Sequence, residues 1–148
     1  LNKTISTMES CSGGALANAI TNIPDASKIF SFGAVTYSNE YKIKMGVDKN
    51  IIDTYSVYSI ETAIEMSKKI SEFTNSNYGI GITGKLNRVD PHNLSGDNNT
   101  VYFSIYNKDK NTNYNDSLKV TKETRKENKE EVIEKIIDKF YKILTKED

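Results

Sequence analysis

The segment 9–14, ESCSGG, places two hydroxyls, the only cysteine of the chain and two glycines within six positions. Alternating β-branched and polar residues at 3–8 predict a strand before it, and apolar residues at helical spacing over 15–23 predict a helix after it. A nucleophile at such a turn would lie beside the free N–H groups of the helix, which can stabilise a developing oxyanion. Serine and glycine are also common in turns, so an equally simple interpretation is a turn in which Ser12 caps the helix. The candidate nucleophiles are Ser10, Cys11 and Ser12.

A serine nucleophile needs a base, and the chain offers a lysine more readily than a histidine. His92, the only histidine, lies in a polar segment beside Pro91, as a solvated loop residue would, so a Ser-His-Asp triad is not expected. Lys42 lies five residues after Tyr37, which ends an expected strand, so the two side chains could converge on one pocket. A lysine acts as a base when burial or a neighbouring cation favours its neutral form, whereas an ordinary surface lysine is the default. Cys11 is expected to be a small buried core residue unless a cation or helix terminus lowers its pKa.

The periodicity of the sequence predicts an alternating α/β chain that would position these residues. Strands are expected at 3–8, 29–37, 78–83, 101–106 and 117–121, and helices at 15–23, 39–45, 60–73 and 130–144. The polar segment 84–99 lacks periodicity and is expected to be a long loop, and 107–116 is expected to be a polar turn. Alternation in the first half predicts helices on both faces of a sheet, and the late hairpin makes that sheet mixed. Residues 1–148 are therefore expected to form a single domain.

The composition excludes several classes of protein. The chain has 20 basic and 20 acidic residues, so no net charge attracts nucleic acid or an anionic membrane. No apolar run approaches the roughly 20 residues that cross a bilayer. A single cysteine excludes an internal disulfide and fits a reducing, cytoplasmic compartment. The His, Cys and acidic residues do not have the spacing of a zinc or calcium site, so no metal is expected.

Three stretches together resemble the CinA C-terminal domain family, the nicotinamide-nucleotide amidases also called PncC. They are TMESCSGGALANAITNIPDAS at 7–27, GAVTYSNEYKIKMGV at 33–47 and VYSIETAIEMS at 57–67. The resemblance is continuous over 4–84, and the combination of ESCSGG with TYSNEYK is specific. It implies a three-layer α/β/α sandwich with a mixed central sheet, usually assembled as a homodimer. It also implies hydrolysis of the carboxamide of nicotinamide mononucleotide to nicotinic acid mononucleotide and ammonia, with no metal or cofactor.

The same resemblance selects among the candidate residues. It implies that Ser10 is the nucleophile and that Lys42, alone or sharing a proton with Tyr37, removes its proton. Backbone N–H groups after Ser10 would hold the oxyanion. The residues that we expect to bind the pyridine-nucleotide substrate are Ser12, Gly13, Gly14, Asn39, Thr83 and Gly84.

The chain also departs from the family pattern in three places. After Gly84, the usual Ile-Ala-Gly-Pro run is replaced by the polar segment KLNRVDPHNLSGDNN, which alters the expected substrate pocket. The basic pattern that opens the family's last helix falls on Asn128, Lys129 and Ile133, and the family's leading helix is expected to be absent. Three functions therefore stay open: an active amidase, a member that binds a nucleotide or protein partner without catalysis, and a purely structural domain.

Overall fold

The computed structural model describes residues 2–87 and 97–147, which form one sheet and the helices that cover it. The elements are β1 (Ile5–Glu9), α1 (Ala15–Thr21), the 3-10 turn η1 (Ala26–Lys28), β2 (Phe30–Val35), α2 (Asn39–Lys44), α3 (Lys49–Tyr55), α4 (Ile60–Thr74), β3 (Tyr78–Gly84), β4 (Thr100–Asn107), β5 (Thr112–Lys119) and α5 (Arg125–Glu147). None of the helices in these described ranges has the length and apolar character needed to cross a membrane.

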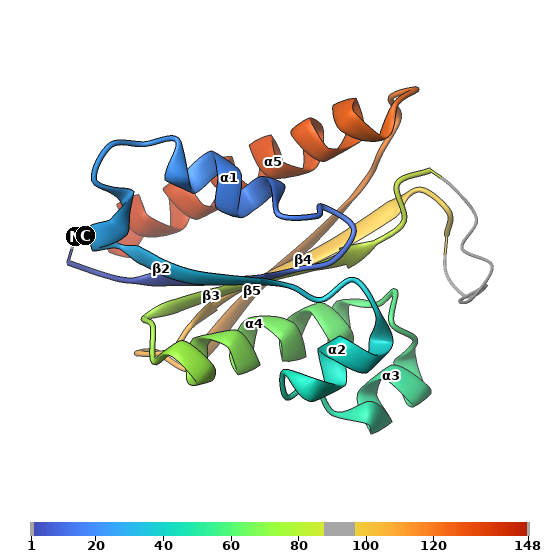
Figure 1. The fold of residues 1–148 in the computed structure, drawn as a ribbon, viewed down its shortest axis with the longest axis horizontal. Coiled ribbons are helices and arrows are strands. Elements are labelled where there is room, and N and C mark those ends of the chain that lie inside the picture. Colours follow the sequence, from blue (N-terminus) through green and yellow to red (C-terminus); the bar gives the residue numbers. More distant parts are fainter. Residues whose placement is uncertain (1, 88–96, 148) are drawn as a thin grey trace.

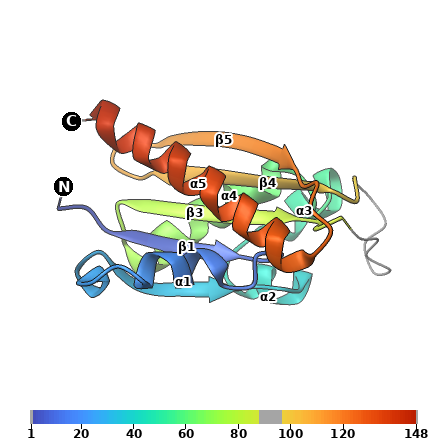
Figure 2. The same cartoon turned by 90° about the horizontal axis from the view of Figure 1, so that it is seen from above.

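The sheet is mixed, and its strand order is β2-β1-β3-β4-β5. Strands β2, β1 and β3 are parallel, whereas β4 and β5 add in antiparallel fashion. Helices α1 and α5 cover one face, and α2, α3 and α4 cover the other (Figure 1). Figure 2 shows α5 running across the strands on the same side as α1. The predicted α/β/α sandwich with a mixed central sheet is thus confirmed.

Two apolar clusters fill the layers on either side of the sheet. Between the sheet and α1 and α5 lie Leu16, Ile80, Ile82, Phe103, Val132 and Ile136. Between the sheet and the other helices lie Met8, Val47, Ile52, Val57, Met66 and Ile70. Alternate residues of β3 supply the first cluster, so the positions between them face α4.

Those intervening positions of β3 are glycines because α4 lies directly against the strand. A Cβ placed at Gly81 would lie 2.4 Å from the carbonyl oxygen of Ala63 and 2.7 Å from Cβ of Met66. A Cβ at Gly79 would lie 2.1 Å from the carbonyl oxygen of Ser67. Since backbone atoms cannot give way as a flexible side chain can, any side chain here would push α4 off the sheet.

We expect Gly81→Ala to lower the free energy of unfolding by about 3 kcal/mol, because the new methyl group overpacks against the α4 backbone. Urea unfolding monitored by circular dichroism measures the change. The matched control is Ser117→Ala on the exposed side of β5, which should stay within about 0.5 kcal/mol of the parent. Equal stability of the two variants would contradict the close approach.

The sequence prediction missed one helix and placed the starts of β5 and α5 too late. Helix α3 was not predicted from the sequence, and β5 begins at Thr112 rather than 117, so the turn is shorter than expected. β5 is an edge strand whose polar residues pair with β4 (Asn107 opposite Thr112), so pairing rather than propensity defines it. α5 begins at Arg125 rather than 130. Thr124 caps its start, because Thr124 Oγ1 accepts from Glu127 N–H at 3.1 Å and donates to Glu127 Oε1 at 2.8 Å.

Candidate active site

Ser10 and Lys42 meet in a buried position at the ends of two neighbouring parallel strands. Lys42 Nζ donates to Ser10 Oγ at 2.9 Å and to the carbonyl oxygen of Thr36 at 2.7 Å. The Lys42 side chain is only 1% exposed and Ser10 is 7% exposed. Ser10 follows β1, Thr36 follows β2, and Thr36 N–H donates to the Glu9 carbonyl at 2.8 Å, which joins the two strand ends. The strands and α2 therefore converge on one hydroxyl–amine pair.

Lys42 reaches this pair from α2, whose start is fixed by its own cap. Ser38 Oγ accepts from Tyr41 N–H at 3.3 Å and so satisfies one of the free donors at the helix start. Lys42 is the fourth residue of this short helix, and it is the helix residue that is buried. Lys42 is therefore not the exposed surface lysine that is the default interpretation of its sequence.

Glu9 organises the turn that carries Ser10. Its carboxylate is buried, and it accepts from Ser12 Oγ at 2.7 Å, Leu16 N–H at 2.9 Å and Ala17 N–H at 2.9 Å. The carboxylate therefore satisfies the free donors at the start of α1 and complements the positive end of the helix. Sequence reasoning missed this role, although an acidic residue directly before a strand-to-helix turn is a signal for it.

Ser12, Gly13 and Gly14, the predicted substrate-binding residues of this turn, do not form the helix cap that the turn interpretation expects. Ser12 does not cap α1, because its hydroxyl donates to Glu9, and the residue before the helix is Gly14 with φ 96°. Gly13 N–H donates to the Ser10 carbonyl at 3.0 Å, which fixes the turn behind the hydroxyl. Gly13 and Gly14 both have positive φ, a conformation that glycine adopts without strain.

Replacing Glu9 should destabilise the protein strongly. We expect Glu9→Ala to lower the free energy of unfolding by about 2–4 kcal/mol, because it leaves two buried donors and one part-buried donor without an acceptor. Glu9→Gln should lie between this variant and the parent, since the amide oxygen keeps part of the acceptor capacity. The control is Glu40→Ala, which removes an exposed ion pair with Lys44 and should change stability by less than about 1 kcal/mol. Similar losses for Glu9→Ala and Glu40→Ala in chemical denaturation would contradict the assignment.

Cys11 is packed in the apolar cluster beside α1 and α5. Burial raises the pKa of its thiol from 9.0 to about 12, although the nearby charges of Lys42 and Arg125 act in the opposite direction. The thiol is therefore protonated at neutral pH, so Cys11 is not the nucleophile of this turn.

The burial of Cys11 predicts a loss of stability in alkali. An unfolded thiol ionises near pH 9.0 while the folded one keeps its proton to about pH 12, so the unfolded state is favoured as the pH rises between these values. The stabilising contribution is complete below pH 9 and falls by about 2 kcal/mol by pH 10.5. The difference in unfolding free energy between the parent and Cys11→Ala, measured at both pH values, isolates this effect from other groups. A difference that is constant with pH would contradict it.

Tyr37 is largely exposed. Its side chain is 65% exposed, and its hydroxyl accepts a hydrogen bond from Arg125 Nη2 at 3.3 Å. The expected convergence of Tyr37 and Lys42 on one pocket stays a prediction. Arg125, at the start of α5, was not singled out from the sequence.

Basic side chains of α5 reach the turn, Lys129 from one of the positions of the family pattern and Arg125 from outside that pattern. A Cβ at Gly13 would lie 3.1 Å from Lys129 Nζ, so this ammonium covers the turn. Asn128 is buried and its side chain accepts from Lys122 N–H at 2.9 Å, while Ile133 belongs to the core. Arg125 and Lys129 therefore supply positive charge near the site.

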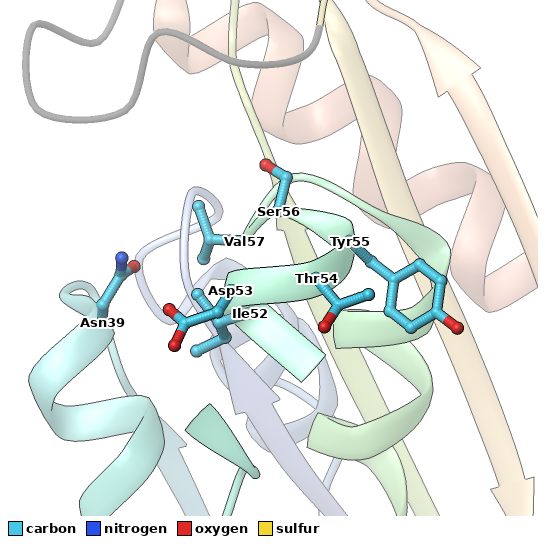
Figure 3. Close-up of a pocket in the computed structure, with 7 residues that line it drawn as sticks. All are labelled: Asn39, Ile52, Asp53, Thr54, Tyr55, Ser56 and Val57. Carbon is cyan, nitrogen blue, oxygen red and sulfur yellow. The ribbon is translucent and has the colours of Figure 1, made fainter. Parts of the chain in front are cut away.

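The other predicted binding residues line or support a hollow on the α2–α3 side. An open hollow of about 480 Å³ is lined by Asn39 of α2 and by residues 52–57 of α3 and the turn after it. Asn39 and Asp53 face each other across this space (Figure 3). Thr83 is fully buried and donates to the carbonyl oxygen of Val57 at 2.9 Å, so it positions the wall of the hollow. Gly84 packs against β4, since a Cβ there would lie 2.6 Å from the Thr100 carbonyl oxygen.

Among the described residues, no group of three or more His, Cys, Asp or Glu side chains lies close enough to hold a metal ion. His92 lies outside the described residues, as does most of the segment that replaces the family's glycine-rich run.

Comparison with known proteins identifies the family of this chain and other proteins that share its fold. The sequence model of the CinA C-terminal domain matches residues 1–144. The chain belongs to the CinA C-terminal domain family. The resemblance expected from the ESCSGG and TYSNEYK motifs is thereby confirmed.

Relatives by sequence are competence-damage inducible proteins. The chain is 48% identical over 82 residues to the protein of Caldanaerobacter subterraneus and 46% identical over 82 residues to that of Clostridium acetobutylicum. Each match covers 55% of this CinA-family chain and 20% of the relative, so the match spans about a fifth of the length of these curated proteins.

Solved structures of CinA-family proteins share the fold. The protein from Enterobacter cloacae superposes with a TM-score of 0.86 at 19% identity, covering 97% of this chain and 83% of that one. The competence damage-inducible protein A from Klebsiella pneumoniae gives 0.85 at 21% identity, covering 97% and 88%. A superfamily protein from Escherichia coli gives 0.76 at 26% identity, covering 89% and 75%.

Proposed function

We propose that this CinA-family domain is an amidohydrolase that converts nicotinamide mononucleotide to nicotinic acid mononucleotide and ammonia. The observation that carries the proposal is the 2.9 Å contact between Lys42 Nζ and Ser10 Oγ in a buried position. A nucleophile and a base within hydrogen-bond reach are the minimum for covalent acyl transfer. The expected setting is the cytoplasm, with the chain as a homodimer.

The burial of Lys42 supports its proposed role as a base. Removing an amine from water disfavours its charged form, and only the neutral amine can accept a proton. The Thr36 carbonyl accepts one Lys42 hydrogen, which orients the nitrogen toward Ser10. With the amine neutral, the bond between them can run from Ser10 O–H to Lys42 Nζ, which prepares the proton transfer.

The proposed reaction passes through an acyl-enzyme. Ser10 Oγ attacks the amide carbon while Lys42 takes its proton, and N–H groups of Ser12 and Gly14 stabilise the oxyanion. Lys42 returns the proton to the departing nitrogen, so that ammonia leaves and an ester on Ser10 forms. Water, deprotonated by Lys42, then attacks this ester and releases the carboxylic acid and free Ser10. Atoms and charge balance without a metal or an oxidant.

Tyr37 as a proton-sharing partner of Lys42 stays a prediction. Its hydroxyl accepts a hydrogen bond from Arg125 at 3.3 Å and keeps its own proton, so the role requires that this hydroxyl lie within reach of Lys42 when substrate binds. Tyr37→Phe separates the possibilities, because it removes a proton relay but keeps the ring.

We expect ammonia release from nicotinamide mononucleotide by the parent protein, measured with a glutamate dehydrogenase-coupled assay. Ser10→Ala should lower kcat by about 10³-fold or more, since it removes the nucleophile. Lys42→Met should lower it by about 10²- to 10⁴-fold, since it removes the base and keeps the side-chain volume. The matched control is Lys44→Met, an exposed lysine of the same helix that pairs with Glu40, and its rate should equal that of the parent.

Unchanged release in Ser10→Ala would contradict the proposal. So would the absence of ammonia at high enzyme concentration with several pyridine nucleotides.

The alternative is a family member that binds a nucleotide or a protein partner without catalysis. The polar segment that replaces the family's usual run after Gly84 favours it, because that segment alters the expected substrate pocket. Nucleotide binding in a calorimeter, with no product from the same sample, would support this alternative.

A further inference from the structure

Lys85 is a buried cation that the proposed chemistry does not use. It follows β3, its side chain is 3% exposed, and its Nζ has no hydrogen-bond partner in the part of the chain that the structure describes. The Nζ lies 4.8 Å from the centre of the Tyr58 ring. A cation–π contact offsets only part of the cost of removing an ammonium from water, so a buried lysine normally has an anionic partner as well.

The neighbouring carboxylates do not supply that partner. Asp53, in the hollow beside this region, is paired with Lys49 at 2.7 Å. Glu61 and Asp97, whose charges raise the pKa of Tyr102 after the larger effect of its burial, form no described ion pair with Lys85. Among the described residues, no carboxylate is thus hydrogen-bonded to this ammonium.

The side chain of Lys85 lies on the same face of the sheet as the Ser10–Lys42 pair. Thr83 faces the α3–α4 side, where it donates to the Val57 carbonyl, and Lys85 lies two residues further along, over Tyr58. Alternate residues of an extended chain share a face. Strands β1 and β3 are adjacent and parallel, so Ser10 and Lys85 both follow strand ends at one edge of the sheet, where α/β proteins bind ligands.

The helix beside Lys85 adds to the positive potential. Tyr58 lies just before α4, a helix of 15 residues whose first N–H groups point toward this end. A positive helix end and an unpaired ammonium repel each other, and both attract an anion. A compact ammonium with three free donors suits a tetrahedral phosphate, whereas carboxylates are more often bound by the planar fork of arginine.

We propose that Lys85 binds a phosphate monoester group of the ligand that occupies the Ser10–Lys42 site. The identity of that ligand rests on the proposed function, whereas the phosphate site itself does not. Lys85 is a specificity residue here: it selects phosphorylated over unphosphorylated ligands and takes no part in bond breaking.

Binding to Ser10→Ala protein tests this without turnover. Nicotinamide mononucleotide and its unphosphorylated riboside are titrated calorimetrically, and inorganic phosphate is tested by thermal shift against sodium chloride of equal ionic strength. Adding Lys85→Met to the Ser10→Ala protein should weaken binding of the mononucleotide about 10-fold or more. It should also abolish the thermal shift caused by phosphate and leave the affinity for the riboside unchanged. The matched control is Lys119→Met, an exposed lysine of β5, which should leave all three unchanged.

Equal mononucleotide and phosphate binding with and without Lys85→Met would overturn the inference, and so would an equal loss for the riboside. The two proposals fail separately. If the parent protein releases ammonia and Lys85→Met has the same KM, the phosphate site is wrong and the proposed amidase activity stands. If phosphate binding depends on Lys85 but no ammonia forms, the phosphate site stands and the proposed amidase activity is wrong. Because Met replaces a buried charge by an apolar side chain of similar length, the variant should fold.

Discussion

The hydrogen bond from Thr36 N–H to the Glu9 carbonyl, at 2.8 Å, is the contact on which the site depends. It continues the pairing of β1 and β2 beyond their last residues. From this joint, the Glu9 side chain holds the start of α1, and the Thr36 carbonyl holds Lys42. One backbone contact thus fixes the direction of both the turn that carries Ser10 and the lysine that faces it. The apolar layers then keep the two strands in place.

Much of this arrangement follows from local sequence patterns. The apolar stripe of α4 and the alternation around ESCSGG were sufficient to place a strand, a turn and a helix next to each other. The resemblance to the family selected Ser10 and Lys42, which the fold brings within 2.9 Å. Periodicity alone could not do this, because the contact joins residues 32 positions apart and depends on which strands are neighbours.

The features that were not predicted fall into three kinds. β5 is polar, and its strand conformation comes from pairing with β4. No local sequence pattern predicts this pairing. The start of α5 and the role of Glu9 did have local signals, namely the T-x-x-E pattern at Thr124 and an acidic residue before a helix turn. The environments of Tyr37 and Lys85 depend on packing between distant segments, so their exposure and burial became visible only in the folded chain.

The capping of α1 by Glu9 has a consequence for how this edge of the sheet can diversify. In many α/β proteins the backbone N–H groups at such a helix start bind the anionic group of the ligand. Anion binding there cannot change unless the conformation of the turn changes. Here a carboxylate of the chain itself occupies the donors of Leu16 and Ala17. Positive charge for a ligand must come from side chains such as Arg125 and Lys129, which point in from another helix. Single substitutions at such side-chain positions can therefore change which ligand binds, while the geometry around the nucleophile stays the same.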